Sequence, residues 1–109
     1  ASAPFPQIIP MRTLCVHGSA EALVKKLNDE YGEVVKWTME VFVDSPSPIG
    51  MIITQNSNNN SGEGSTTVLL SNPNLGMSCI FFTGKSLKDT GADADVPVKE
   101  PLKEGKLNV

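Results

Sequence analysis

The hydrophobic periodicity of this chain changes once, at Gly32, and that change restricts the fold class. Before Gly32, residues 19–31 repeat apolar side chains at helical spacing. One stripe along this predicted helix is formed by Ala20, Leu23, Val24, Leu27 and Tyr31. Ser19 is suited to cap the helix start, Glu21 suits its positive end, and Gly32 is suited to end it. After Gly32 the period is two, which is typical of strands.

Four segments after Gly32 are rich in β-branched or apolar residues and are separated by turn-forming sequence. The predicted strands are residues 34–43, 50–55, 65–71 and 77–83. Pro, Asn and Gly residues interrupt them at 45–48, 56–64 and 72–76. Short connections favour an antiparallel meander. The predicted fold is therefore α+β, with one N-terminal amphipathic helix packed on a four-stranded antiparallel meander.

Strand alternation also predicts which side chains the helix covers. Within residues 34–43, one face carries Trp37, Met39, Val41 and Val43, and the other carries Lys36, Thr38, Glu40 and Phe42. The helix is expected to bury its stripe against Val34 or Val35, Ile52, Val68, Leu70 and Ile80. The opposite face is expected to keep Thr and Lys residues and to be solvated or paired.

The two ends of the chain differ in composition from its centre. Residues 1–12 contain three prolines, which favour an extended arm. Residues 13–86 are expected to form a single α+β domain, consistent with a chain of 109 residues. Residues 87–109 carry charges of both signs and few large apolar side chains, so they are expected to form a polar tail.

Two cysteines, Cys15 and Cys79, are separated by most of the predicted domain. An even cysteine count in so small a chain favours a disulfide, which would contribute about 4 kcal/mol in the chain-entropy model. The alternative is a pair of unrelated buried thiols in a cytosolic protein. Ala1-Ser2-Ala3 has the small-x-small form that precedes a signal-peptidase cut. We therefore predict a secreted protein, periplasmic or extracellular, made with a signal peptide.

Few side chains are arranged for catalysis. Cys15 and the single histidine, His17, share a face of an extended segment, so a Cys–His nucleophile is conceivable, but a dyad of sequence neighbours is unusual. Glu33 and Glu40 are seven residues apart and are predicted to lie on opposite faces of a strand, which separates them as an acid–base pair. We predict no enzymatic activity.

Metal and cofactor sites are not expected either. One histidine and two isolated cysteines cannot supply the three or four ligands of a zinc site. Asp89, Asp93 and Asp95 lack the spacing and the closing Glu of a calcium loop. A Gly-Glu-Gly sequence at 62–64 lacks the helix that follows a phosphate-binding loop. No cofactor is predicted.

The charge distribution limits the class of partner. The net charge is −3, and nine Lys and Arg residues are spread along the chain without a basic stripe. Nucleic-acid binding depends on clustered cations, so a nucleic-acid partner is not expected. No apolar run approaches the roughly 20 residues of a spanning helix, so no membrane insertion is expected.

A longer pattern resembles a known family. Cys15 precedes a helix ending in Tyr31-Gly32-Glu33, and residues 66–86 read TTVLLSNPNLGMSCIFFTGKS. The pattern is similar to a family of small exported proteins of unknown function from alphaproteobacteria and marine sources. The residues shared with that family are Cys15, Tyr31, Gly32, Glu33, Pro73, Gly76, Cys79 and Gly84.

The chain also departs from that family. The family's Trp in the third strand is replaced here by Thr66 or Thr67, and the turn carries an additional Leu75. The family has no assigned activity. The resemblance therefore implies export and a Cys15–Cys79 bridge, and it implies nothing about chemistry.

Two functions remain after these exclusions. The first is a small exported binding or interaction protein of unknown specificity. The alternative is a structural subunit of a virion, surface layer or filament that assembles through its extended termini, since extended segments commonly bind by strand addition. In either case the termini are expected to reach a protein partner, and the chain is compatible with an oligomer.

Overall fold

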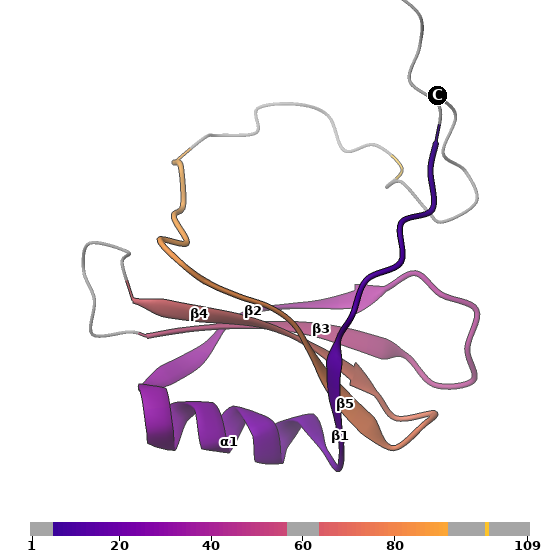
Figure 1. The fold of residues 1–109 in the computed structure, drawn as a ribbon, viewed down its shortest axis with the longest axis horizontal. Coiled ribbons are helices and arrows are strands. Elements are labelled where there is room, and N and C mark those ends of the chain that lie inside the picture. The colour runs from indigo at the N-terminus through magenta and orange to yellow at the C-terminus, as the bar shows by residue number, and fades with distance from the viewer. Residues whose placement is uncertain (1–5, 57–63, 92–99, 101–109) are drawn as a thin grey trace, which may run out of the picture.

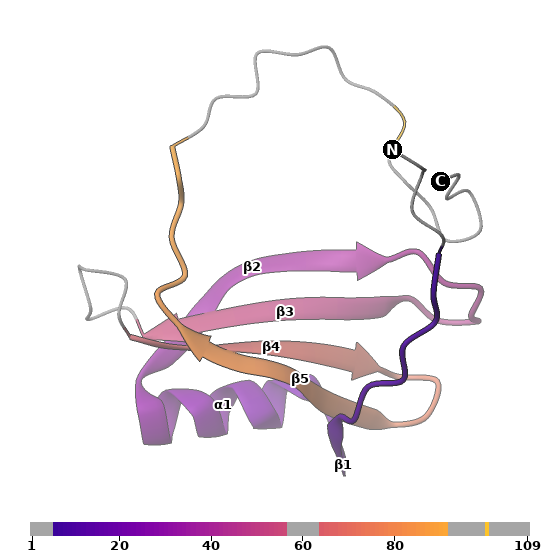
Figure 2. The same cartoon turned by 45° about the horizontal axis from the view of Figure 1, so that its top comes forward.

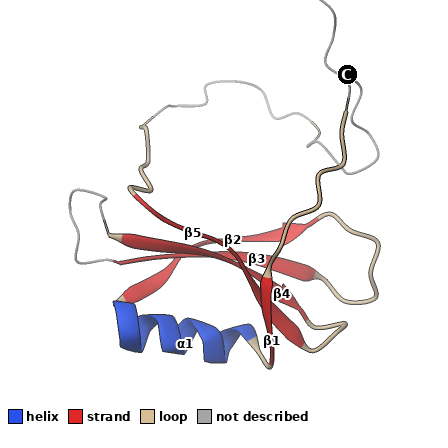
Figure 3. Ribbon diagram, viewed as in Figure 1, coloured by secondary structure: helices blue, strands red, loops and turns tan. Residues whose placement is uncertain are grey.

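A computed structural model of the protein describes residues 6–56, 64–91 and 100. The elements in chain order are β1 (Leu14–His17), α1 (Ala20–Tyr31), β2 (Glu33–Val41), β3 (Ile49–Asn56), β4 (Ser65–Asn72) and β5 (Met77–Lys85). The strands form one antiparallel sheet in the order β1-β5-β4-β3-β2. Helix α1 lies along one side of this sheet (Figures 1 and 3).

The predicted four-stranded meander is wrong, because β1 adds a fifth strand at the edge of β5. In β1, Leu14 lies opposite Ile80 and Cys15 lies opposite Cys79. A strand of four residues is at the lower limit of the length at which alternation can be recognised in a sequence. The strand forms because the edge of β5 supplies hydrogen-bond partners for its main chain. Gly18 then turns the chain into α1 with a φ of 128°, in the region that favours glycine.

Helix α1 begins and ends where its capping residues predict. The Ser19 hydroxyl accepts a hydrogen bond from the Ala22 amide at 3.3 Å. Gly32 has a φ of 69°, and its amide donates to the Asn28 carbonyl at 2.9 Å. Ala20 and Leu27 are buried against the sheet, as the stripe predicts. Tyr31 is the exception, since it is 55% exposed at the helix end.

The sheet face under α1 can be assigned from the strand register. Residues opposite one another on neighbouring strands share a face, so Ile52, Leu69 and Ile80 form one row. The Ser78 hydroxyl donates to the Gly18 carbonyl at 3.1 Å, which places this face next to the start of α1. Leu69 is fully buried at its centre. Buried threonine and glutamate side chains occupy neighbouring rows of the same face, so the core under the helix is partly polar.

The other face carries two of the side chains that the sequence assigned to the core, whereas Ile52 and Ile80 lie on the α1 side as predicted. Val68 lies opposite Ile53, and Leu70 lies opposite Met51, on the face away from Leu69 and from α1. The expectation that α1 covers Val68 and Leu70 is therefore wrong. The threonine-bearing face is the covered one, and the solvated face is apolar. A bulge between Val35 and Trp37 keeps Trp37 on this second face while Val35 lies on the first.

Candidate functional site

The face of the sheet away from α1 is a continuous apolar surface. Two rows cross its strands, one running through Trp37, Ile53, Val68 and Phe82, the other through Met39, Met51, Leu70, Cys79 and Cys15. We call these nine residues the open face. Trp37 is 46% exposed, Met39 53% and Phe82 52%. Single exposed apolar residues are ordinary on protein surfaces, whereas a contiguous apolar patch indicates an interaction site.

A small hollow lies at the β2–β3 end of the open face. Its volume is about 270 Å³. It is lined by Trp37, Thr38, Met39, Met51 and Ile53. Sites for small molecules and cofactors commonly occupy about 300–1,000 Å³, so this hollow is nearer the size of a few apolar side chains.

The chain after β5 turns toward the open face. Figures 1 and 2 show residues 86–91, and the arm that precedes β1, on the side of the sheet opposite α1. Ser86 has a φ of 63°, and the Gln55 side chain then donates to the Leu87 carbonyl at 2.9 Å. A hollow of about 410 Å³ lies beside this segment and is lined by residues that include Thr66, Val68, Phe82 and Leu87. Segment 86–91 therefore borders the open face at one end.

The Thr66 hydroxyl is a polar feature of this end. Thr66 lies opposite Gln55 and so shares the open side of the sheet. Its residue is 7% exposed, and among the described residues its Oγ1 has no hydrogen-bond partner. A buried hydroxyl without a partner costs about 1–3 kcal/mol relative to a paired one.

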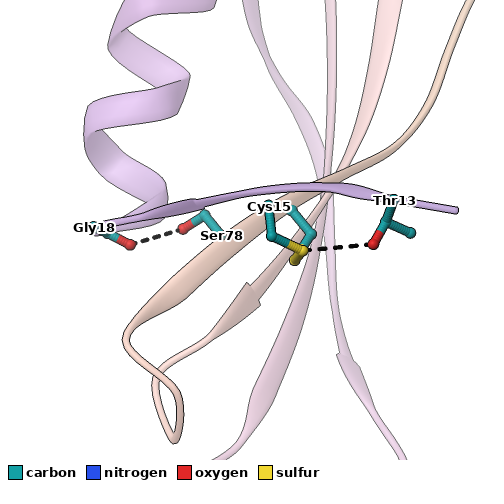
Figure 4. Close-up of a disulfide and its surroundings, with 5 residues drawn as sticks. Thr13, Cys15, Gly18 and Ser78 are labelled. Atoms are coloured by element: carbon teal, nitrogen blue, oxygen red, sulfur yellow. Dashed lines mark hydrogen bonds between the residues drawn. A yellow bond between two sulfur atoms is a disulfide. The ribbon is translucent and has the colours of Figure 1, made fainter.

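The predicted disulfide is present and lies at the β1–β5 side of the open face, away from β2. Cys15 of β1 and Cys79 of β5 are bonded across 64 residues of sequence. The disulfide sulfur carries no proton, so the Thr13 hydroxyl is the donor in its 3.5 Å contact with Cys15 Sγ (Figure 4). Because Cys15 is bonded to Cys79, no free thiol stands beside His17, and the Cys–His nucleophile considered above is absent from this structure.

A buried carboxylate, Glu33, was missed as a site in the sequence. Its side chain is 2% exposed. The Thr54 hydroxyl donates to Oε1 at 2.7 Å, and the Ser65 hydroxyl donates to Oε2 at 2.9 Å. These bonds connect the start of β2 to β3 and β4. A Glu directly after the helix-ending Gly32 was visible in the sequence, but its two partners come from distant strands.

The prediction that Glu33 and Glu40 lie on opposite faces is also wrong. Glu33 lies opposite Asn56, and Glu40 lies opposite Gly50, which share a face of β3. The bulge after Val35 shifts the alternation by one residue and brings both carboxylates to the covered side. They are still roughly 20 Å apart along β2, given the rise of a strand. The two groups therefore do not form an acid–base pair.

A third hollow, of about 560 Å³, borders Glu33. Tyr31, Ser65, Thr83 and Lys85 are among its lining residues. Both Glu33 oxygens already accept hydrogen bonds from protein hydroxyls. The carboxylate is therefore arranged as an anchor between elements. In residues 6–56 and 64–91, no group of three His, Cys, Asp or Glu side chains is placed to hold a metal ion.

The anchoring role of Glu33 gives a stability prediction. Glu33→Ala is expected to lower the free energy of unfolding by about 2 kcal/mol, because the Ser65 hydroxyl loses its acceptor and the Thr54 hydroxyl keeps only its longer contact with the Thr67 carbonyl. Glu33→Gln keeps one carbonyl oxygen and should cost less. Urea unfolding measures both. Glu30→Ala, at an exposed helix position, is the control and should stay within about 0.5 kcal/mol of wild type. Equal costs for Glu33→Ala and Glu30→Ala would contradict the anchor.

Comparisons with known proteins identified no relative of this chain. No protein-family model matches the chain, and searches of curated proteins and of solved structures found no match. The resemblance to small exported proteins therefore stays a prediction. In the part of the chain that the structure describes, no helix has the length and hydropathy needed to span a bilayer.

Proposed function

We propose that this chain is a small exported interaction protein that binds an apolar segment of another protein on its open face. The observation that carries the proposal is the exposure of Trp37, Met39 and Phe82 on one sheet face, while α1 covers the centre of the other. Binding would remove these side chains from water, which is favourable by about 25 cal/mol per Å² of apolar area. Recognition of a protein surface, rather than catalysis, is the activity this arrangement suits.

The chemistry of the open face indicates the kind of partner. Its nine residues are all apolar, with one Trp, two Met and one Phe among them. Aromatic residues and Met are enriched at protein interfaces, and Met side chains adapt to irregular partners. A partner segment with apolar side chains and no charge at its centre fits this surface, because a charged group placed here would lose its hydration without gaining an ion pair.

Export is supported by the bridge between Cys15 and Cys79. Disulfides persist in oxidising compartments such as the periplasm and the extracellular space, and are rare where thiols are kept reduced. In the exported form the bridge would hold β1 against β5. The open face would then meet partners outside the cytosol.

The single tryptophan makes the proposal testable. Random peptides displayed on phage are selected on the protein, and their binding is followed by Trp37 fluorescence. Apolar peptides are expected to bind and to shift the emission to the blue as Trp37 leaves water. Phe82→Glu is expected to weaken binding about tenfold or more. Leu75→Glu changes a more exposed apolar residue in the β4–β5 turn and serves as the control. Equal affinity for both variants, or selection of charged peptides only, would contradict the proposal.

The alternative, a structural subunit that assembles through its termini, is favoured by one observation. In the arm before β1, Ile8 is fully exposed, Ile9 is 72% exposed and Met11 61% exposed. The arm therefore offers apolar side chains that the domain does not cover. The tail interpretation rests mostly on residues 92–99 and 101–109, which lie outside the described residues. Large assemblies that disappear when residues 1–12 are deleted, and persist in Phe82→Glu, would favour this alternative.

A further inference from the structure

The outer edge of β2 is an unused pairing surface within the described part of the chain. β2 is nine residues long and stands at the end of the sheet, with β3 as its only strand neighbour there. Main-chain amides and carbonyls along an edge strand can pair with another strand. The open face continues to this edge, since Trp37 and Met39 both belong to β2. An added strand would therefore extend both the sheet and the open face.

The sequence of β2 is complementary to itself in one antiparallel register. When two copies pair about Thr38 along the outer edge of β2, Lys36, the residue inserted at the bulge, lies opposite Glu40 of the partner subunit. Trp37 then lies opposite Met39 of the partner subunit, on the open face. Opposite charges and aromatic–aliphatic pairs placed directly across strands are favourable, as is a Thr–Thr pair at the centre. Lys36 and Glu40 are both exposed and have no ion pair among the described residues.

Other registers lose this complementarity. A shift by one residue brings Trp37 opposite Thr38 or Glu40 of the partner subunit, which mixes the apolar and polar faces. A shift that keeps the faces aligned places Lys36 opposite Thr38 or Phe42 of the partner subunit, and the ion pair is lost. A lysine on an edge strand ordinarily discourages pairing. Here Lys36 lies opposite a carboxylate in the register centred on Thr38 and in none of the shifted registers above. Pairing with a second copy is therefore favoured over pairing with an unrelated strand.

We propose that two copies of this chain associate through antiparallel pairing of β2 about Thr38. The interface is isologous, so each copy supplies the same residues and the assembly closes as a dimer. The two sheets become one, and the open faces join across the Trp37–Met39 contacts. The inference does not depend on the proposed binding function, because it is measured from the mass of the protein alone.

Charge reversal across the pair tests the register directly. The wild-type chain of 11.6 kDa is expected to sediment as a monomer–dimer equilibrium. Lys36→Glu places like charges opposite each other twice per dimer, and should raise the dimer dissociation constant about tenfold or more. Glu40→Lys should do the same. The double variant Lys36→Glu/Glu40→Lys restores opposite charges and should recover the dimer, as should an equimolar mixture of the two single variants.

Lys26→Glu is the matched control, because it makes the same charge change at an exposed position of α1 away from β2. It should leave the dissociation constant unchanged. Circular dichroism of each variant verifies that the fold is retained. A wild-type chain that stays monomeric at millimolar concentration would overturn the proposal, and so would a dimer that tolerates both single reversals. Peptide binding is also measured on the monomeric Lys36→Glu variant. This measurement tests the proposed binding function separately from the dimer.

Discussion

Replacing Cys15 and Cys79 together with serine is expected to lower the free energy of unfolding by about 4 kcal/mol. The bridge joins residues 64 apart in sequence, and in the chain-entropy model a loop of that length restricts the unfolded chain by about this amount. A domain of this size has a total stability of only about 5–10 kcal/mol. The loss is therefore a large part of the whole. Urea unfolding followed by circular dichroism measures it.

Reduction of the disulfide with dithiothreitol is the control for the double substitution. Dithiothreitol should destabilise the wild-type protein by a similar amount and leave the Cys15→Ser/Cys79→Ser variant unchanged. Hydrogen exchange should locate the first loss of protection in β1, because its short pairing with β5 is the part that the bridge holds. A loss of less than about 1 kcal/mol in the variant would contradict this account of the bridge.

Leu69→Ala is expected to lower the free energy of unfolding by about 3 kcal/mol. Leu69 is fully buried between the sheet and α1, at the centre of the row formed with Ile52 and Ile80. Truncation removes buried methyl groups and leaves a cavity that the rigid sheet cannot fill. Thermal or urea unfolding of the variant measures the effect.

Leu70→Ala is the matched control, because it makes the same change one residue later. Leu70 is half-buried on the open face, so its truncation should cost about 1 kcal/mol. The ratio of the two losses therefore tests which face α1 covers. Equal losses, or a larger loss at Leu70, would contradict the face assignment on which the proposed binding surface depends.

The polar core under α1 explains why a covalent bridge matters in this fold. Thr54, Thr67 and Ser78 are each 2% exposed or less, and Glu33 is buried with them. These side chains add hydrogen bonds, but each has less apolar area to bury than an aliphatic side chain of similar size. Apolar burial is the dominant favourable term in folding. The exposed parts of the open-face side chains add to apolar burial only when a partner covers them.

Local features of the chain were predictable from the sequence. The limits of α1 depend on Ser19 and Gly32, whose capping acts within four residues of the helix ends. The change to a two-residue period after Gly32 correctly indicated β2 to β5. The even cysteine count, together with the small size, indicated the bridge between Cys15 and Cys79. Each of these inferences depends on contacts between near neighbours or on composition.

The faces and edges of the sheet were decided by tertiary structure. β1 has only four residues, and it forms because β5 is present 60 residues later to pair with it. The bulge between Val35 and Trp37 depends on the register with β3, and it decides which side of β2 each residue occupies. Residues of β4 point alternately to the two faces of the sheet, and each face carries both threonine and apolar side chains. Alternation alone therefore could not decide which face α1 covers.

Sequence by itself therefore determined the helix, four of the five strands and the bridge, because local spacing and cysteine count encode them. The tertiary structure alone decided the fifth strand, the anchor at Glu33 and the open face. The physical reason is that a strand has two equivalent sides in sequence, and long-range pairing breaks that equivalence. The candidate site lies on the side that this pairing leaves uncovered.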